Sequence, residues 1–262
     1  GVDSVLNVRV KECAPFENVY TLALRGLHDR AMNASNDMGD RKDMLQEALM
    51  AQRQMLIDAI GKPGEEIPQA FTPYKEVLDV YDEGLELPDD VTIIWPDDNY
   101  GYMKRLSSPK EQKRSGRSGV YYHSSYLGKP HDHLWMNTVS PTLMYEELRK
   151  AYDATADRIW LLNAGDIKSC EFAVDYFLTM AFDIDAFNFE RAANYRTEWL
   201  CGMLGDQYRN EYQDVVNSFY KLAFARKPEF MGWGYQWTTD KHGRERNTDT
   251  DFSLTNYREV DN

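Results

Sequence analysis

Short runs of β-branched and aromatic residues alternate with longer amphipathic runs over roughly the first 185 residues of the chain. The runs typical of strands lie at 18–25, 68–72, 91–95, 119–123 and 158–163. Apolar residues at helical spacing lie at 40–60, 77–81, 141–152 and 171–182. Strands that alternate with helices predict crossover connections and a parallel sheet. We therefore expect an α/β fold in this part of the chain.

The number of these units narrows the choice of α/β fold. Five predicted strands are too few for a closed eight-stranded barrel. Either the sheet is open and doubly wound, or it belongs to a barrel whose leading strands lie before residue 1. No Gly-x-Gly-x-x-Gly motif follows any predicted strand, so the sequence lacks the main motif that would indicate a dinucleotide-binding fold.

Strand signals end near residue 187, and helical spacing continues alone to about residue 225. An aromatic-rich stretch without clear periodicity follows Pro228. We predict two domains, an α/β domain at residues 1–185 and an α-helical domain with a loop-rich tail at residues 186–262.

Charge and hydropathy exclude several partners. The formal net charge is −13, which disfavours binding to the phosphate backbone of nucleic acid. No apolar run approaches the roughly 20 residues that a membrane helix requires, so no membrane span is predicted. Cys13, Cys170 and Cys201 lie far apart without a Cys-x-x-Cys motif, and we interpret them as core or incidental thiols.

Polar and ionisable residues gather at the carboxyl end of nearly every predicted strand. In chain order they are Arg25, His28 and Asp29; Tyr74, Lys75 and Glu76; Asp97, Asp98 and Asn99; His123; and Asn163 and Asp166. Loops are polar in any protein, but repetition across five elements favours a common site at that edge of the sheet.

Several of these residues lie in motifs that resemble glycoside hydrolase family 115, the xylan α-1,2-glucuronidases. The motifs, in order, are Leu24-Arg25-Gly26-x-His28-Asp29, Tyr74-Lys75-Glu76-Val77, Trp95-Pro96-Asp97-Asp98-Asn99-Tyr100-Gly101, Val120-Tyr121-Tyr122-His123, Tyr126-Leu127-Gly128 and Asp157-Arg158-Ile159-Trp160 with Asn163-x-Gly165-Asp166. The likeness runs from about residue 16 to residue 256, and it is the order and spacing of the motifs that make it specific.

The resemblance implies the later strands of a (β/α)8 TIM-type barrel, followed by a helical domain. Residues 1–185 would then be the C-terminal part of a catalytic barrel. Its leading strands and other domains would lie outside this chain. The implied reaction removes glucuronic acid or 4-O-methylglucuronic acid from glucuronoxylan or its oligosaccharides, with inversion, without a cofactor and without a metal. The resemblance also implies a periplasmic or secreted protein, while a homodimer stays open.

An inverting glycosidase needs one carboxylic acid to protonate the leaving oxygen and one carboxylate to activate water. Glu76 matches the glutamate of the family's Tyr-Lys-Glu motif, which makes it the candidate acid. Its alternative interpretation is a solvated glutamate that the helix dipole favours at a helix start. Asp29 and Asp97 are the candidate bases, with Asp98 beside them. Asp97 and Asp98 could equally anchor a loop or cap a helix.

Substrate-binding roles fall to basic and amide side chains. Arg25, Lys75 or His123 would bind the uronate carboxylate, and Asn99 and Asn163 would contact sugar hydroxyls. Trp95, Trp135 and Trp160 could stack on sugar or pack in a core. The spacing of His131-Asp132-His133 is typical of metal ligands, but a structural role is the simpler interpretation.

Two other functions remain open at this point. The chain could be a non-catalytic carbohydrate-binding or scaffold fragment of such an enzyme. It could also be a metal-dependent hydrolase that uses Asp97, Asp98 and His123.

Overall fold

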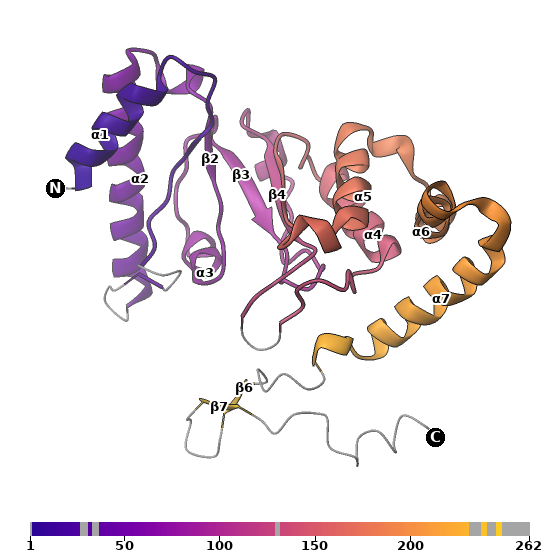
Figure 1. The fold of residues 1–262 in the computed structure, drawn as a ribbon. Helices are drawn as coiled ribbons and strands as arrows, with labels where there is room; N and C mark the ends of the chain where they lie inside the picture. Colours follow the sequence, from indigo (N-terminus) through magenta and orange to yellow (C-terminus); the bar gives the residue numbers. More distant parts are fainter. Residues whose placement is uncertain are drawn as a thin grey trace. The chain divides into compact units, whose positions relative to one another are not determined.

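A parallel five-stranded sheet forms the centre of the fold in the computed structural model (Figure 1). The structure describes residues 2–26, 31–32, 37–128, 132–230, 237–239 and 245–247. The strands are β1 (Tyr20–Thr21), β2 (Gln69–Phe71), β3 (Thr92–Pro96), β4 (Ser118–His123) and β5 (Trp160–Asn163), and they lie side by side in this order. Neighbouring strands in a parallel sheet that follow chain order are joined by crossovers, as the sequence predicts.

One helix precedes the strands, and the others connect or follow them. They are α1 (Val2–Cys13), α2 (Met38–Ile60), α3 (Glu76–Asp82), α4 (Pro141–Asp153), α5 (Glu171–Phe182), α6 (Phe189–Leu204) and α7 (Arg209–Ala225). The parallel sheet with its helices, and the helical segment after it, confirm the predicted fold class, a partial TIM-type barrel followed by helices. Strands β6 (Trp237–Thr239) and β7 (Glu245–Asn247) pair antiparallel in the tail, where only loops were predicted.

The residues form two compact units that interleave along the sequence. Unit 1 comprises Gly1–Pro96, Lys104–Tyr121 and Ala151–Trp160, and unit 2 comprises Asp97–Met103, Tyr122–Lys150 and Leu161–Asn262. These units do not test the predicted domain boundary near residue 185, which stays a prediction.

Helix α2 shows how the sequence builds the core of unit 1. The Asp37 carboxylate caps the helix by accepting a hydrogen bond from the Asp40 N–H, and Gly61 ends it at a φ of 74°. Leu45, Leu49 and Leu56 share one buried face of the helix. Each fully buried leucine contributes about 1.5–3 kcal/mol, so this face anchors α2 within the unit's core.

The register of the sheet sets the positions of the loops that follow each strand. Tyr20 of β1 lies opposite Gln69 of β2, and Ala70 of β2 lies opposite Thr92 of β3. Trp95 of β3 lies opposite Val120 of β4. Strands β2 and β3 are buried at every position, as expected for a parallel sheet covered on both faces.

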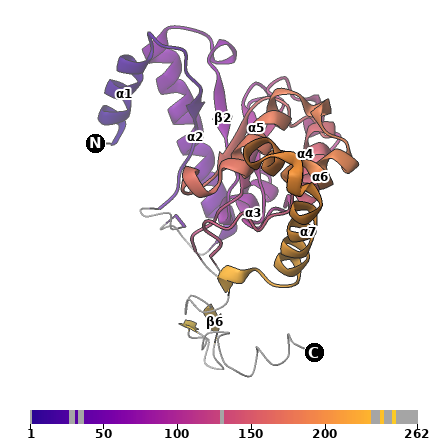
Figure 2. The ribbon, with the colours of Figure 1, turned by 45° about the vertical axis from the view of Figure 1, so that its right-hand side comes forward.

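Helices α5, α6 and α7 pack around a single arginine in unit 2, and α6 and α7 run beside each other (Figure 2). The Arg196 guanidinium of α6 donates a hydrogen bond to the Tyr220 hydroxyl of α7 at 2.7 Å. Its Cζ also lies 5.3 Å from the centroid of the Phe172 ring on α5 and 5.0 Å from that of Phe219. Cation–π contacts of this kind stabilise the helical part by about 0.5–2 kcal/mol each.

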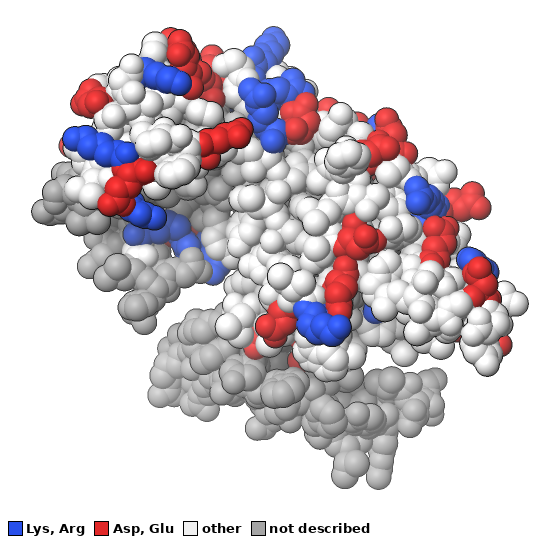
Figure 3. Space-filling model, turned by 45° about the horizontal axis from the view of Figure 1, so that its top comes forward, with Lys and Arg blue, Asp and Glu red and all other residues white. Residues whose placement is uncertain are grey.

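Charge is mixed over one face of the residues that the structure describes. On the face drawn in Figure 3, acidic and basic side chains are interspersed among uncharged ones. That face therefore presents no continuous basic patch, which nucleic-acid binding would require. Among the described residues, no helix has both the length and the apolar character needed to cross a bilayer.

Candidate active site

The loop after β2 brings Arg25 and Glu76 together in unit 1. Arg25 Nε and Nη2 donate to Glu76 Oε1 and Oε2, each at 3.1 Å. The two side chains are 19% and 24% exposed, so the pair is shielded but reachable from solvent. This two-point contact is the fork geometry with which arginine binds carboxylates.

Lys75, the residue before Glu76, has a strained backbone. Its φ is 52° and its ψ is −124°, a region that residues other than glycine rarely occupy. Such strain costs about 1–3 kcal/mol and persists where the surrounding structure imposes it, most often at functional sites. The conformation turns the chain from the loop directly into α3.

The ring of Tyr74 organises the same loop. The Lys75 ammonium lies 5.1 Å and the Arg25 guanidinium 5.5 Å from the centroid of this ring. Tyr74 also packs edge-on against Tyr121 of β4, with ring centroids 5.8 Å apart. The aromatic ring thus holds two cations near Glu76, although only its motif position singled it out in the sequence.

Asp97 and His123 form a buried pair in unit 2. Asp97 Oδ1 and His123 Nδ1 are 2.6 Å apart, and both side chains are at most 1% exposed. The Asp97 carboxylate also accepts hydrogen bonds from the backbone N–H groups of Asn99, Gly101 and His123. These contacts fit the loop-anchor interpretation of Asp97 better than that of a base in contact with water.

Asn99 adopts the left-handed conformation in this anchored loop, with a φ of 74°. Its carbonyl oxygen lies 2.7 Å from Nε2 of the buried His133. Burial lowers the pKa of His133 to about 4, so the imidazole is neutral near pH 7 and Nε2–H donates to the carbonyl. Asp98 accepts from the N–H groups of Tyr100 and Tyr102, which again places a carboxylate in loop geometry.

Asn163 closes β5 and fixes the chain that follows β4. Its carbonyl oxygen accepts hydrogen bonds from the N–H of Ser124 at 3.0 Å and of Ser125 at 3.2 Å. Its side chain is half-buried beside this turn. The predicted site residues of unit 2 therefore lie on connected loops.

A family model described as glycosyl hydrolase family 115 matches residues 1–230. The chain belongs to this family. A solved structure titled a novel family GH115 4-O-methyl-α-glucuronidase, BtGH115A, with specificity for decorated arabinogalactans, is 39% identical in sequence. The match covers 99% of this chain with a TM-score of 0.87 and 34% of that protein, so this chain spans about a third of its length. No curated protein matches.

Family 115 membership confirms the resemblance that the motifs indicate, but it does not assign a catalytic or binding role to any residue of this chain. The structure pairs Arg25 with Glu76 in unit 1 and Asp97 with His123 in unit 2. Asp29 lies outside the described residues, as does His131 of the metal-like spacing. Among the residues that the structure describes, no group of three His, Cys, Asp or Glu side chains could hold a metal ion.

The three tryptophans proposed as sugar platforms have different environments. Trp95 is fully buried, and its Nε1–H donates to Ser107 Oγ, so it packs in the core. Trp160 is half-buried, with its Nε1–H donating to the Ala156 carbonyl. Trp135 is 53% exposed. Only Trp135 among them presents a large ring surface to solvent.

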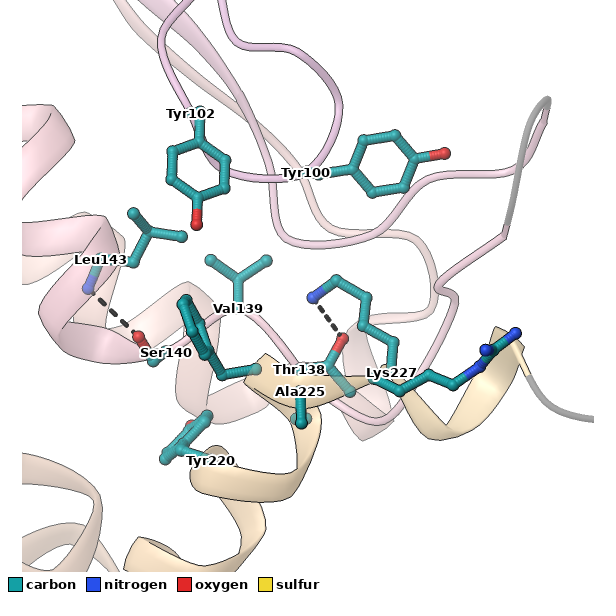
Figure 4. Close-up of a pocket in the computed structure, with 12 residues that line it drawn as sticks. Tyr100, Tyr102, Thr138, Val139, Ser140, Leu143, Tyr220, Ala225 and Lys227 are labelled. Carbon is teal, nitrogen blue, oxygen red and sulfur yellow. Dashed lines mark hydrogen bonds between the residues drawn. The ribbon is translucent and has the colours of Figure 1, made fainter. Parts of the chain in front are cut away.

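Sequence reasoning missed Lys227 and Glu229, which follow α7. Glu229 is buried, and its carboxylate accepts hydrogen bonds from the N–H groups of Leu134, Trp135 and Met136. The Lys227 ammonium donates to Thr138 Oγ1 at 2.9 Å (Figure 4). No sequence pattern pointed to them, because the residues that they bind, Met136 and Thr138, lie about 90 positions earlier in the chain.

Lys227 and Thr138 border a pocket of about 490 Å³ within unit 2 (Figure 4). Its walls include Tyr100, Tyr102, Leu143, Tyr220 and Lys227. Burial lowers the pKa of Lys227 to about 8, while the nearby Glu229 and Asp98 carboxylates act in the opposite direction. The ammonium is thus largely charged at pH 7 and supplies a partly desolvated cation to the pocket.

Proposed function

We propose that this chain forms part of a glycoside hydrolase that removes glucuronic acid or 4-O-methylglucuronic acid from the side chains of a plant polysaccharide. Family 115 membership supports a glycosidase, and the solved relative is titled a 4-O-methyl-α-glucuronidase. The observation that carries the proposal is the Arg25–Glu76 pair next to the strained Lys75. This arrangement places a carboxylate and two cations around one ring, Tyr74.

Glucuronoxylan is the proposed substrate, as the motif resemblance implies. The solved relative is described as specific for decorated arabinogalactans, which makes that polysaccharide the second candidate. Both carry anionic uronate groups, so both fit an arginine that can bind a carboxylate. The two are separated by measuring release from each polymer.

Glu76 is the proposed general acid. In the structure it is an ion-paired carboxylate, and a bound uronate would compete with it for Arg25. Exchange of that partner frees Glu76 to meet the leaving oxygen, to which a general acid donates its proton. Lys75 is the second proposed ligand for the uronate.

The general base of the proposed inverting mechanism is a carboxylate held roughly 6.5–9.5 Å from the acid. Asp29 is the candidate, because the oxygens of Asp97 are engaged by His123 and by backbone N–H groups. We assign Asp97 instead to holding His123 in place. Asn99 and Asn163 remain the proposed ligands for sugar hydroxyls, and His123 remains a candidate ligand for the uronate carboxylate.

Release of uronic acid by the full-length protein that contains this chain tests the proposal. Glu76→Gln is expected to lower kcat by about 10²–10⁴-fold while sugar binding stays measurable. Glu83→Gln, an exposed glutamate just after α3, is the matched control and is expected to leave kcat unchanged. Undiminished turnover in the Glu76 variant would remove this residue from the mechanism.

Two alternatives give different results in the same assay. A non-catalytic carbohydrate-binding protein binds the polymer but releases no uronate, with or without Glu76. A metal-dependent hydrolase built on Asp97, Asp98 and His123 loses turnover after exhaustive chelation. A periplasmic or secreted location is proposed with the hydrolase, because a polymeric substrate lies outside the cytoplasm.

A further inference from the structure

Trp135 exposes a large indole surface in a loop of unit 2. Tryptophan is highly buried on average in folded proteins, yet this side chain is 53% exposed. Leu134 beside it is 38% exposed, Leu127 is 75% exposed and Ile167 is 70% exposed. These apolar side chains belong to the loops that follow β4 and β5.

Short contacts join these two loops. Tyr126 and His133 form an antiparallel bridge, with hydrogen bonds of 2.7 and 3.0 Å between their backbone groups. Cys170, which follows the Ile167–Ser169 turn, points its thiol toward the Leu134 carbonyl at 3.9 Å. Leu127, Trp135 and Ile167 are therefore carried by one connected set of loops.

The backbone under Trp135 is held rigidly. Glu229 accepts hydrogen bonds from three successive N–H groups, those of Leu134, Trp135 and Met136. The Lys227 ammonium donates to the hydroxyl of Thr138, which follows Trp135 in the same segment of the chain (Figure 4). A backbone fixed in advance lowers the conformational entropy that is lost when the side chain on it binds a ligand, which suits a recognition platform.

The loop that carries Trp135 follows strand β4, and the carboxyl end of that strand holds a proposed substrate-binding residue. Strand β4 ends at His123, and the chain continues through Ser124 and Ser125, which bind the Asn163 carbonyl, to Trp135. In (β/α) barrels the loops at the carboxyl ends of the strands carry the substrate site. Trp135 thus lies on the loop that begins after His123, and the start of this loop is bonded to Asn163; both are proposed substrate-binding residues.

The net charge of the chain does not favour long-range attraction of an anionic polymer. The chain has a net charge of −13, so it does not attract an anionic polysaccharide over long range. One face of a pyranose ring consists mainly of C–H groups, which carry partial positive charge and fit the negative face of an indole. Stacking therefore offers a contact that does not depend on the sign of the protein's charge.

We propose that Trp135 is a platform on which a neutral sugar ring of the polysaccharide stacks. The proposal rests on the proposed function and adds to it the preference for polymer over small substrates. Glu229 acts as a positioning residue, since it touches only the backbone under the indole.

The test compares Trp135→Ala, Trp135→Phe and wild type in the full-length protein that contains this chain. Two substrates are used, the uronate-bearing polymer and a disaccharide of the uronate and one sugar. For Trp135→Ala we expect KM on the polymer to rise about 3- to 10-fold, with kcat/KM on the disaccharide within about 2-fold of wild type. Trp135→Phe is expected to recover most of the loss, because a phenyl ring can also stack.

Phe182→Ala is the matched control, because Phe182 ends α5 and is 96% exposed. It removes an exposed aromatic ring outside these loops and is expected to change neither substrate's kinetics. An unchanged polymer KM in Trp135→Ala, or an equal loss on both substrates, would overturn the platform.

Retardation of the protein in gels that contain the polymer gives a readout without turnover. If wild type is retarded but releases no uronate, the proposed function is refuted. The platform still stands in that case if Trp135→Ala migrates faster than wild type. Wild type that turns over but migrates like Trp135→Ala refutes the platform alone.

Discussion

Lowering the pH from 7 to 5 is expected to destabilise the protein through one buried histidine, His133. Its Nε2–H donates to the Asn99 carbonyl, and its ring packs against Tyr100 with centroids 5.4 Å apart. Burial lowers its pKa from the usual 6.5 to about 4. The folded state therefore keeps the imidazole neutral over a range in which the unfolded chain takes up a proton.

The sign and size of the effect follow from linkage. Because the unfolded state binds more protons between pH 6.5 and pH 4, the free energy of unfolding falls as the pH drops through this window. A shift from 6.5 to about 4 gives a loss of roughly 2 kcal/mol at pH 5 and roughly 3 kcal/mol at pH 4. Above about pH 7 the contribution is fully present.

Urea unfolding of wild type and His133→Gln at pH 7, 6 and 5 measures this contribution. Glutamine can donate a hydrogen bond to the Asn99 carbonyl but does not titrate, so the difference between the two curves isolates the histidine. We expect wild type to lose roughly 2 kcal/mol more than the variant between pH 7 and pH 5. Parallel curves for the two proteins would refute the reasoning.

Two further predictions concern backbone conformation. Lys75→Gly is expected to raise the free energy of unfolding by up to about 1–3 kcal/mol, because it relieves the strain at φ 52°. The same variant is expected to lower turnover, because it removes the Lys75 side chain. Thermal unfolding and uronate release measure the two effects, with Lys62→Gly in the loop after α2 as the control. Gly165→Ala is expected to cost about 1–3 kcal/mol, because its φ is 61° and an added Cβ would meet Ser125 Oγ at 2.5 Å. Gly202→Ala within α6, where an added Cβ meets nothing within 4 Å, is expected to stabilise by about 0.5–1 kcal/mol; equal effects at the two glycines would contradict this account.

Periodic elements could be predicted from the sequence because their signal is local. The predicted helix at 171–182 coincides with α5, and the predicted helix at 40–60 lies within α2. Helix α1 was not predicted, since valines and charged residues alternate in it without a clear apolar stripe. The first strand was predicted at 18–25 but pairs only at Tyr20 and Thr21, because the chain diverges from β2 after Leu22.

Pairings between distant residues could not be predicted in this way. The motifs singled out Arg25 and Glu76 separately, but their two-point contact spans 51 residues. Asp97 was a candidate base because it is a carboxylate at the end of a predicted strand, within one of the family-like motifs. Its burial and its bonds to three N–H groups depend on the loop conformation, which a single sequence does not specify.

The hydrogen bonds of Glu229 have a kinetic consequence. They close a loop of up to 95 residues, and the entropy of such a closure must be overcome before the contact contributes any energy. The loop of Trp135 therefore becomes ordered late in folding, after α6 and α7 have formed and carried Glu229 into place. During refolding, its amides are therefore expected to gain protection from hydrogen exchange later than those of the buried strands.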